Sequence, residues 1–437
     1  MTSTITYFDL TTSSSPSHPL LIEMEDEEEQ ICGDGETYTL ARFLFIFLSI
    51  WIAFLGIVGN LVLFYVFIKH KYPNTPPTLY PSALAILDSI ICLMYILLFG
   101  ADAMVNFWQW HSLFLIYHIY IVPAFVISRI TQLAIPYMLI FATLERLVWI
   151  VGDLRNKILK KMYSHQGRKI TMILSLSICV ILRLPTYFAV EVYEYPKCDD
   201  FFRSKTASAS PWVPESLVYH IYDFHLLSIA QTVFPFIVLI TFNFIIVRRL
   251  YVIKYNDREE ITASEIPLKT NSVDYGNQAE HRPSIFPPDK ETESKDTSLL
   301  YSKTLMLSDQ MKIYNILKLF YVSMIFPKRG MNSAVKSAIY TMVAIVSSYL
   351  LSNSLHLILT GLERSNSVLL RHPTDPNLAS TFHTIFSDIV SFVYMFTSAI
   401  RVIIYYICNS TIRADLKQSI KTFFAYKSKN INGVVAI

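Results

Sequence analysis

The residues best suited to chemistry in this chain are ionisable side chains inside stretches that are otherwise apolar. Asp88 and Arg401 lie within two such stretches, and Glu145 and Arg146 are neighbours at the end of a third. A charged group in lipid is costly unless it is paired, so a functional role is the usual reason for its presence. We therefore expect these charged side chains to form ion pairs. An enzyme is disfavoured, because the sequence has no HExxH, nucleophile-elbow or P-loop motif.

Long apolar elements must position these charges. The chain has 437 residues, of which 53% are hydrophobic, 14% aromatic and 16% charged, against about a quarter charged in soluble domains. A hydrocarbon core about 30 Å thick requires roughly 20 apolar residues per helix, and a helix satisfies its own backbone in lipid. We therefore predict an all-α, seven-transmembrane helix bundle with spans over residues 41–68, 78–101, 116–150, 170–190, 222–253, 337–362 and 378–408.

The loop charges predict how these spans are oriented. The segments after the first, third, fifth and seventh spans are rich in Lys and Arg, whereas the acidic run 23–29 lies on the opposite side. Lys and Arg accumulate on the cytoplasmic side of a membrane. The prediction is a multi-pass plasma-membrane protein with an extracellular amino terminus and a cytoplasmic carboxyl terminus.

The remaining segments are polar. We predict disorder for the acidic tail 1–40 and for most of the long cytoplasmic third loop, 254–336, because both have low hydrophobicity and many charges. An amphipathic segment near 313–326 is too short to span and suits the inner leaflet, with an eighth span as the weaker alternative. Residues 409–424 fit a surface helix, followed by a tail, 425–437, whose apolar ending could bind a PDZ domain but more often has no role.

Several polar positions within the spans carry a family resemblance. They are Gly56-Ile-Val-Gly-Asn60, Leu84-Ala-Ile-Leu-Asp88, Glu145-Arg146-Leu147, Pro235 and Arg401-Val-Ile-Ile-Tyr405. In this order and spacing they resemble the rhodopsin-like G-protein-coupled receptors, whose patterns are GxxGN, LAxxD, (D/E)R, a span-five proline and NPxxY before an eighth helix. Within that family, the stretches 142–149 and 397–405 look most like invertebrate neuropeptide receptors of the FMRFamide-like kind.

The resemblance implies a receptor that binds an extracellular ligand and opens a cytoplasmic cleft for a heterotrimeric G protein. Arg146 matches the family's switch arginine, held by Glu145 when inactive, and Tyr405 matches the tyrosine that swings inward on activation. An arginine at a helix end could instead only reach for the lipid headgroups. Asn60 and Asp88 deeper in the bundle favour the switch. We expect no cofactor, and the sequence has no metal-ligand spacing.

Arg401 is the most informative departure from the family pattern, since NPxxY has Asn at this place. In the family that Asn lies beside the span-two acid, and the two help to hold a sodium ion. Here Arg401 would meet Asp88 directly, and a bidentate arginine–carboxylate pair is strong in a low dielectric. Our hypothesis is that this built-in cation replaces sodium. The alternative is that Arg401 points elsewhere and Asp88 is protonated.

The cysteines depart from the family as well. Ile121 stands near the place of the span-three cysteine that normally bonds to the second outer loop, so Cys198 lacks its usual partner. Cys32 lies on the same predicted side of the membrane, which makes a Cys32–Cys198 disulfide plausible. Two unpaired thiols are the alternative.

The outer third of the bundle should hold a ligand, as clefts between helices usually do. The charged and aromatic candidates for this pocket are Asp102, Trp108, Trp110, Arg129, Arg183, Asp223 and Asp388. They suit a short peptide with charged and aromatic groups. Equally, the arginines could pair with the acids to hold the bundle together, and the tryptophans could be interface aromatics.

Other functions remain open at this level. An amine receptor and a retinal protein are disfavoured, since the span-three Asp and a span-seven Lys are missing. A transporter or channel would line a pathway with polar residues across several spans, whereas the inner halves here are almost purely apolar. A receptor relic that no longer couples is a further alternative.

Overall fold

The computed structural model describes residues 32–33, 38–69, 78–151, 161–248, 333–365, 368–370, 380–419 and 421. Contacts between residues divide the chain into two units, Met1–Phe244 with Gly330–Ile437 and Ile245–Arg329. The first unit contains the features discussed below, and the described residues of the second, 245–248, are helical. The predicted segment 313–326 and the predicted PDZ ligand 435–437 lie outside the described residues.

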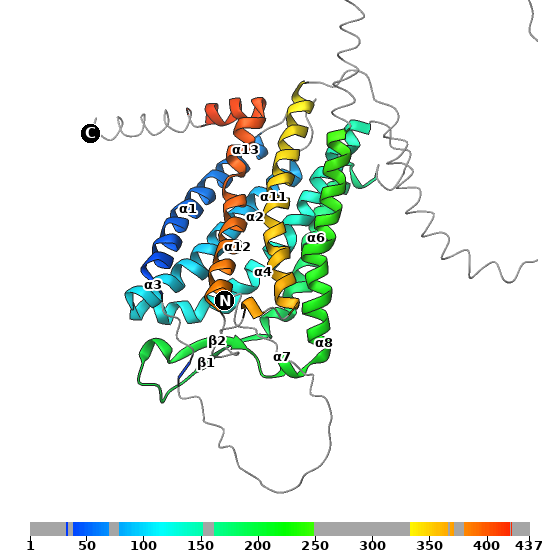
Figure 1. Cartoon of the computed structure of the whole chain (residues 1–437). Coiled ribbons are helices and arrows are strands. Elements are labelled where there is room, and N and C mark those ends of the chain that lie inside the picture. The colour runs from blue at the N-terminus through cyan, green and yellow to red at the C-terminus, as the bar shows by residue number, and fades with distance from the viewer. Residues whose placement is uncertain are drawn as a thin grey trace, which may run out of the picture. The chain divides into compact units, whose positions relative to one another are not determined.

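In the described part of the chain, six helices are long and apolar enough to cross a membrane, and a bent pair, taken as one span, supplies a seventh. The helical elements that begin or fill these spans are α1 (Leu40–Lys69), α2 (Leu79–Tyr95), α4 (His111–Val151), α6 (His165–Arg183), α8 (Leu217–His220) and α11 (Ser333–Arg364). The bent pair is α12 (Thr381–Ala399) with α13 (Arg401–Cys408), which meet at 40°. This arrangement confirms the predicted all-α seven-transmembrane fold (Figure 1).

Two of the spans change helical pitch along their length. The second continues from α2 through a π-helix, η1 (Ile96–Gly100), into α3 (Ala101–Trp108). The fifth passes from α8 through two π-helices, η4 (Ile221–Leu227) and η5 (Ile229–Val233), and continues to Arg248. Such π-segments are uncommon and often accompany functional sites. Both of these lie where side chains enter the cavities described below.

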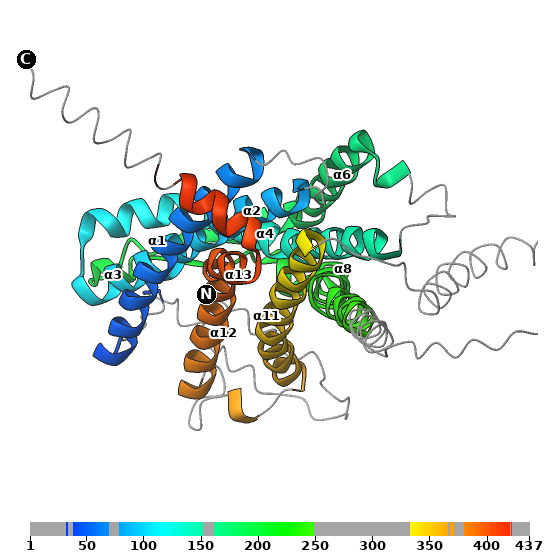
Figure 2. The same ribbon diagram turned by 90° about the horizontal axis from the view of Figure 1, so that it is seen from above.

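The core of the bundle surrounds α4, which packs against α2, α6, α11 and η5. Figure 2, which looks along the bundle, shows α4 among these neighbours. Its side chains Leu133, Ile135 and Met138 are completely buried. By contrast, Trp51 of α1 is 58% exposed, as expected for an apolar face that contacts lipid. A helix this central is well placed to relate one end of the bundle to the other.

A β-hairpin caps one end of the bundle. Strand β1 (Val190–Glu194) pairs antiparallel with β2 (Lys205–Ala209), with η3 (Phe201–Arg203) between them and α7 (Trp212–Glu215) after them. The sequence patterns did not predict this sheet, because each strand has only five residues and the alternation of apolar and polar residues in each is too short to indicate a strand. We call this the disulfide end, after Cys32 and Cys198, and the opposite end the Glu145 end. Figure 1 shows the hairpin at the lower end and α13 at the upper.

Candidate functional site

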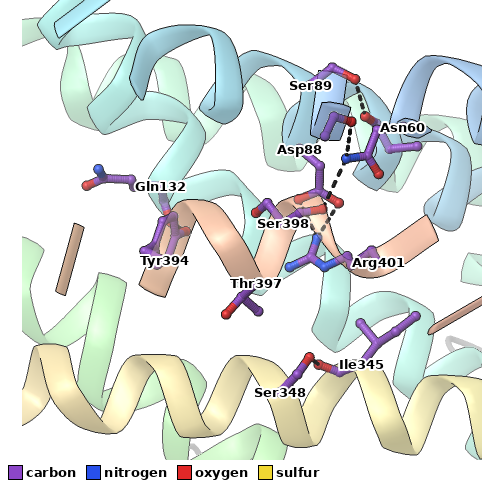
Figure 3. Close-up of polar contacts among 12 residues, drawn as sticks. Asn60, Asp88, Ser89, Gln132, Ile345, Ser348, Tyr394, Thr397, Ser398 and Arg401 are labelled. Atoms are coloured by element: carbon purple, nitrogen blue, oxygen red, sulfur yellow. Dashed lines mark hydrogen bonds and ion pairs between the residues drawn. The ribbon is translucent and has the colours of Figure 1, made fainter. Parts of the chain in front are cut away.

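An ion pair lies at the centre of the bundle, between Asp88 of α2 and Arg401 of α13. The Nη1 atom of Arg401 donates to Oδ1 and Oδ2 of Asp88 at 2.5 and 2.6 Å. Both side chains are 1% exposed. Figure 3 shows the guanidinium directed at the carboxylate, with Ser398 beside them. The sequence hypothesis expected these two residues to meet, and the structure brings them together.

The geometry of this pair differs from the expected bidentate fork, because one nitrogen serves both carboxylate oxygens. Among the described residues, Nε of Arg401 has no hydrogen-bond partner. Arg401 begins α13 immediately after the bend at Ile400, and so its guanidinium reaches Asp88 with one branch only. The pair is charge-assisted and buried, and its hydrogen bonding is incomplete.

Asn60 of α1 supports the bend that carries Arg401. Its Nδ2 atom donates to the backbone oxygens of Gly56 and Ser398, both at 3.0 Å. Carbonyl groups near a helix break lose regular partners, so a side-chain donor stabilises them. A Cβ atom on Gly56 would lie 2.7 Å from Cβ of Ala399, and therefore this glycine lets α1 approach the bend closely.

A first cavity lies within the helix bundle, with Tyr38 and Asp102 in its lining. It has a volume of about 160 Å³ and lies among α1, α2, α4, α11 and α12. Its polar lining includes Tyr38, Arg42, Asp102, Ser128, Arg129, Gln132, Gln231, Asn353, His356 and Glu363. Tyr38 donates to Oδ2 of Asp102 at 2.6 Å. Asp388 does not line the cavity itself; it binds Nε of Arg42 at 2.6 Å and Nη2 at 3.3 Å.

The second cavity, also about 160 Å³, shares Phe125, Arg129, Gln231, His356 and Glu363 with the first. Arg183 and Asp223 line it and form an ion pair, with Nη1 3.1 Å from Oδ1. Arg183 also donates through Nη2 to Oε1 of Gln231. The structure thus brings four of the predicted pocket residues, Asp102, Arg129, Arg183 and Asp223, onto cavity walls.

Trp108 and Trp110 lie outside both cavities. They are 53% and 56% exposed, and neither is among the lining residues. Trp108 contacts the ring of Phe43 at a centroid distance of 5.5 Å. They lie at the junction between α3 and α4, because Gln109 adopts a left-handed conformation there and turns the chain. This position fits interface aromatics better than ligand contacts.

At the Glu145 end, the acid of the Glu145-Arg146 pair contacts a residue from another helix. Oε1 of Glu145 accepts from Nη1 of Arg168 in α6 at 3.0 Å. Glu145 also lies within electrostatic range of its neighbour Arg146, so this acid attracts two arginines, one from α4 and one from α6. Arg146 is 5% exposed, and Tyr405, 4% exposed, stacks edge-on against Phe67 at 5.1 Å. In the sequence, Arg168 lies in the basic segment after the third predicted span, where no pattern distinguishes it from the other loop charges.

A short helix follows α13 over residues 410–419. The backbone N–H groups of Thr411 and Ile412 donate to Oδ1 of Asn409 at 3.2 Å, which is an N-cap. Ile412 and Leu416 are buried against the core. Ile412 and Leu416 are four residues apart and share one face of this helix. This spacing of apolar residues predicts the surface helix over 409–424.

Cys32 and Cys198 form a disulfide. Beside it, Gly33 N–H donates to the Arg203 oxygen at 3.0 Å, and Nε of Arg203 donates to the Gly33 oxygen at 2.8 Å. These contacts fasten the amino-terminal segment to the hairpin. At the hairpin edge, Lys205 donates to Glu194 at 2.6 Å, and this hydrogen bond lowers the pKa of the Glu194 carboxyl.

Aromatic packing holds the hairpin to α4. Phe201 and Phe202 lie 4.7 and 5.0 Å from the ring of His111, and 5.2 and 5.5 Å from that of Phe114. Receptors of the pattern described above use a disulfide to the third span at this place. Here ring contacts make the attachment to α4, and the disulfide runs to the amino-terminal segment instead.

The bundle of membrane spans and its buried charges define a multi-span helical membrane protein. Residues 50–271 match the model of the serpentine-type 7TM GPCR chemoreceptor Srx family. Since this match covers just over half of the 437 residues, the chain belongs to the Srx family of seven-transmembrane G-protein-coupled chemoreceptors. A comparison with curated proteins finds no significant match. The rhodopsin-like and FMRFamide-type resemblance stays a prediction.

Several residues of the site escaped the sequence analysis. Arg42, Gln231, His356 and Glu363 line cavities, and Arg168 binds Glu145. Arg42 and Glu363 lie close to predicted span ends, where charges are ordinary and therefore uninformative. His356 and Gln231 are polar residues within apolar spans, which is the same signal that identified Asp88. If uncharged polar residues within apolar spans are counted as well as charged ones, the same signal identifies both His356 and Gln231.

Proposed function

We propose that this protein is a plasma-membrane receptor that binds a small extracellular molecule and activates a heterotrimeric G protein. In this proposal the disulfide end faces outward and the Glu145 end faces the cytoplasm. The Lys/Arg-rich segments support this orientation, since they follow the first, third, fifth and seventh spans. Membership of a G-protein-coupled chemoreceptor family supports the coupling.

One observation carries the proposal, namely the alignment of a polar cavity, a buried ion pair and a second charged site along one bundle. The cavity is lined by α2, α4 and α12. The Asp88–Arg401 pair joins the second and seventh spans. At the Glu145 end, Glu145 joins α4 to α6. A ligand that shifts α4 or α12 therefore acts on elements that extend to the Glu145 end.

The cavity volumes favour a small ligand. Each cavity measures about 160 Å³, below the range of about 300–1,000 Å³ for drug-sized ligands. A short peptide, which the sequence favoured, is the second candidate. The observation in its favour is the mixture of acids and arginines on the walls, which would suit both termini of a peptide.

A reporter assay tests this proposal. The full chain, expressed in cells with promiscuous G proteins, should respond to members of a library containing volatile compounds, organic acids, amines and short peptides. The variant Arg146→Ala should reach the cell surface and lose the response. A chain that moves an ion or solute instead, or that responds equally with Arg146→Ala, would contradict coupling through the Glu145 end.

A further inference from the structure

Among the described residues, Arg129 has no acidic partner, which distinguishes it from the other two arginines on the cavity walls. Arg42 is bound by Asp388 and Arg183 by Asp223. Within the described part of the chain, the Arg129 guanidinium has no hydrogen bond or ion pair to another side chain, and it lies over the ring of Phe125, 4.9 Å from its centroid. An arginine within a membrane bundle normally pairs with an acid, a backbone carbonyl or a ligand.

The position of Arg129 exposes it to both cavities. It lies on the wall that the two cavities share, together with His356 and Gln231. Arg183 lies close enough for the two guanidiniums to repel each other. Arg183 already donates to Asp223 and Gln231. An anion beside Arg129 would reduce the repulsion between the two guanidiniums and would accept hydrogen bonds from Arg129.

The neighbouring acids limit how much negative charge a ligand can carry. Asp102 and Glu363 line the first cavity, and Glu363 and Asp223 line the second. Glu363 is two helical turns beyond His356, about 10 Å along the axis, and lies 3.4 Å from His383. A dicarboxylate would carry a second negative charge into a cavity whose walls already hold these acids, and a phosphate would place up to two charges beside one guanidinium, whereas a single carboxylate matches the single charge of Arg129.

Part of the first cavity wall is apolar. Its lining includes Ile91, Met94, Leu98, Phe99, Leu359 and Met395. We propose that Arg129 binds the carboxylate of a small monocarboxylic acid whose apolar body lies among these side chains. This assignment rests on the proposed receptor function and specifies its ligand class.

Matched acids and amides test the assignment. Benzoate, phenylacetate, 4-phenylbutyrate and hexanoate, each paired with its neutral primary amide, are added to the purified full-length receptor in nanodiscs. The acids should raise the melting temperature more than their amides. In Arg129→Gln this difference should disappear, with an apparent affinity for the acids roughly ten- to a hundredfold weaker, as expected for a charge-assisted hydrogen bond. Arg129→Lys should retain part of it.

The controls separate the charge of Arg129 from its structural role. Lys197→Gln removes one positive charge from the exposed hairpin loop, outside both cavities, and should keep the full preference for acids. Arg129 takes part in no ion pair among the described residues, so Arg129→Gln breaks none of them and should fold like the wild type. If amides stabilise the receptor as well as acids do, or if the preference survives in Arg129→Gln, the assignment is overturned.

The same compounds in the reporter assay distinguish this inference from the receptor function. Responses to neutral compounds or amines that are unchanged in Arg129→Gln would overturn the carboxylate assignment and leave the receptor function intact. Stabilisation by acids through Arg129, without any G-protein response, would support the carboxylate site and contradict the coupling.

Discussion

Asp88 and Arg401 illustrate how a buried ion pair depends on both partners. Each is costly to bury alone, and their attraction in a low dielectric offsets that cost only while both are present. The pair here uses one nitrogen for two oxygens and leaves Nε of Arg401 without a described partner. It therefore stabilises the fold less than a bidentate pair with two nitrogen donors would. It nevertheless requires α2 and α13 to lie side by side.

Removing one partner should destabilise the receptor more than removing both. Asp88→Asn or Arg401→Gln alone should lower the free energy of unfolding by about 3–5 kcal/mol, because a buried charge is left uncompensated. The double variant Asp88→Asn/Arg401→Gln should lose less than the sum. Thermal unfolding of the purified variants measures this. Strict additivity would mean that the two groups do not interact energetically.

The same pair predicts indifference to sodium. The Arg401 guanidinium binds both Asp88 oxygens and supplies the positive charge that a sodium ion would otherwise bring to this carboxylate. Replacing sodium by choline at constant ionic strength should therefore change neither the melting temperature nor the potency of an activating compound. A clear sodium effect that Asp88→Asn abolishes would refute this hypothesis.

At the scale of elements, the hairpin and the amino-terminal segment form one attachment at the disulfide end. The Cys32–Cys198 bond, the Gly33–Arg203 hydrogen bonds and the aromatic contacts to α4 act on the same short stretch. Tyr38, six residues after Cys32, then reaches Asp102 on the cavity wall. The disulfide therefore helps to position a side chain of the cavity as well as the hairpin.

Loss of this disulfide should weaken both stability and ligand response. Cys32→Ser and Cys198→Ser should each lower the free energy of unfolding by about 2–5 kcal/mol, and the double variant should match either single one, since one bond is lost in every case. Cys408→Ser, a free cysteine in α13, serves as the control. Melting curves with and without reductant provide the measurement. Unequal single variants would indicate a role beyond the bond.

At the scale of the whole molecule, the Glu145–Arg168 contact joins α4 to α6 at the end opposite the cavity. Glu145 is 1% exposed and Arg168 is 17% exposed at their side chains, so the pair is well shielded from solvent. Helix α4 thereby carries a cavity residue, Arg129, and an end contact, Glu145. Such a helix can transmit a ligand-induced shift if it has two stable positions.

Breaking this contact should alter signalling without ligand. Glu145→Gln and Arg168→Gln should each raise basal G-protein activity in the reporter assay, because both release α4 from α6. Their effects should overlap, so that the double variant resembles either single one. Cell-surface staining controls for expression. Independent, additive effects would show that the two residues act on different steps.

The sequence determined the number and placement of the spans, because lipid imposes a length and an apolar composition on each helix independently of its neighbours. It also identified Asp88, Arg129, Arg183, Asp223 and Arg401 as unusual, since charge in an apolar span is a local property. The rotation of each helix about its axis is set by packing against the others. Only the tertiary structure therefore decided that Arg168 binds Glu145, that Arg42 binds Asp388, and that Trp108 and Trp110 lie outside the cavities.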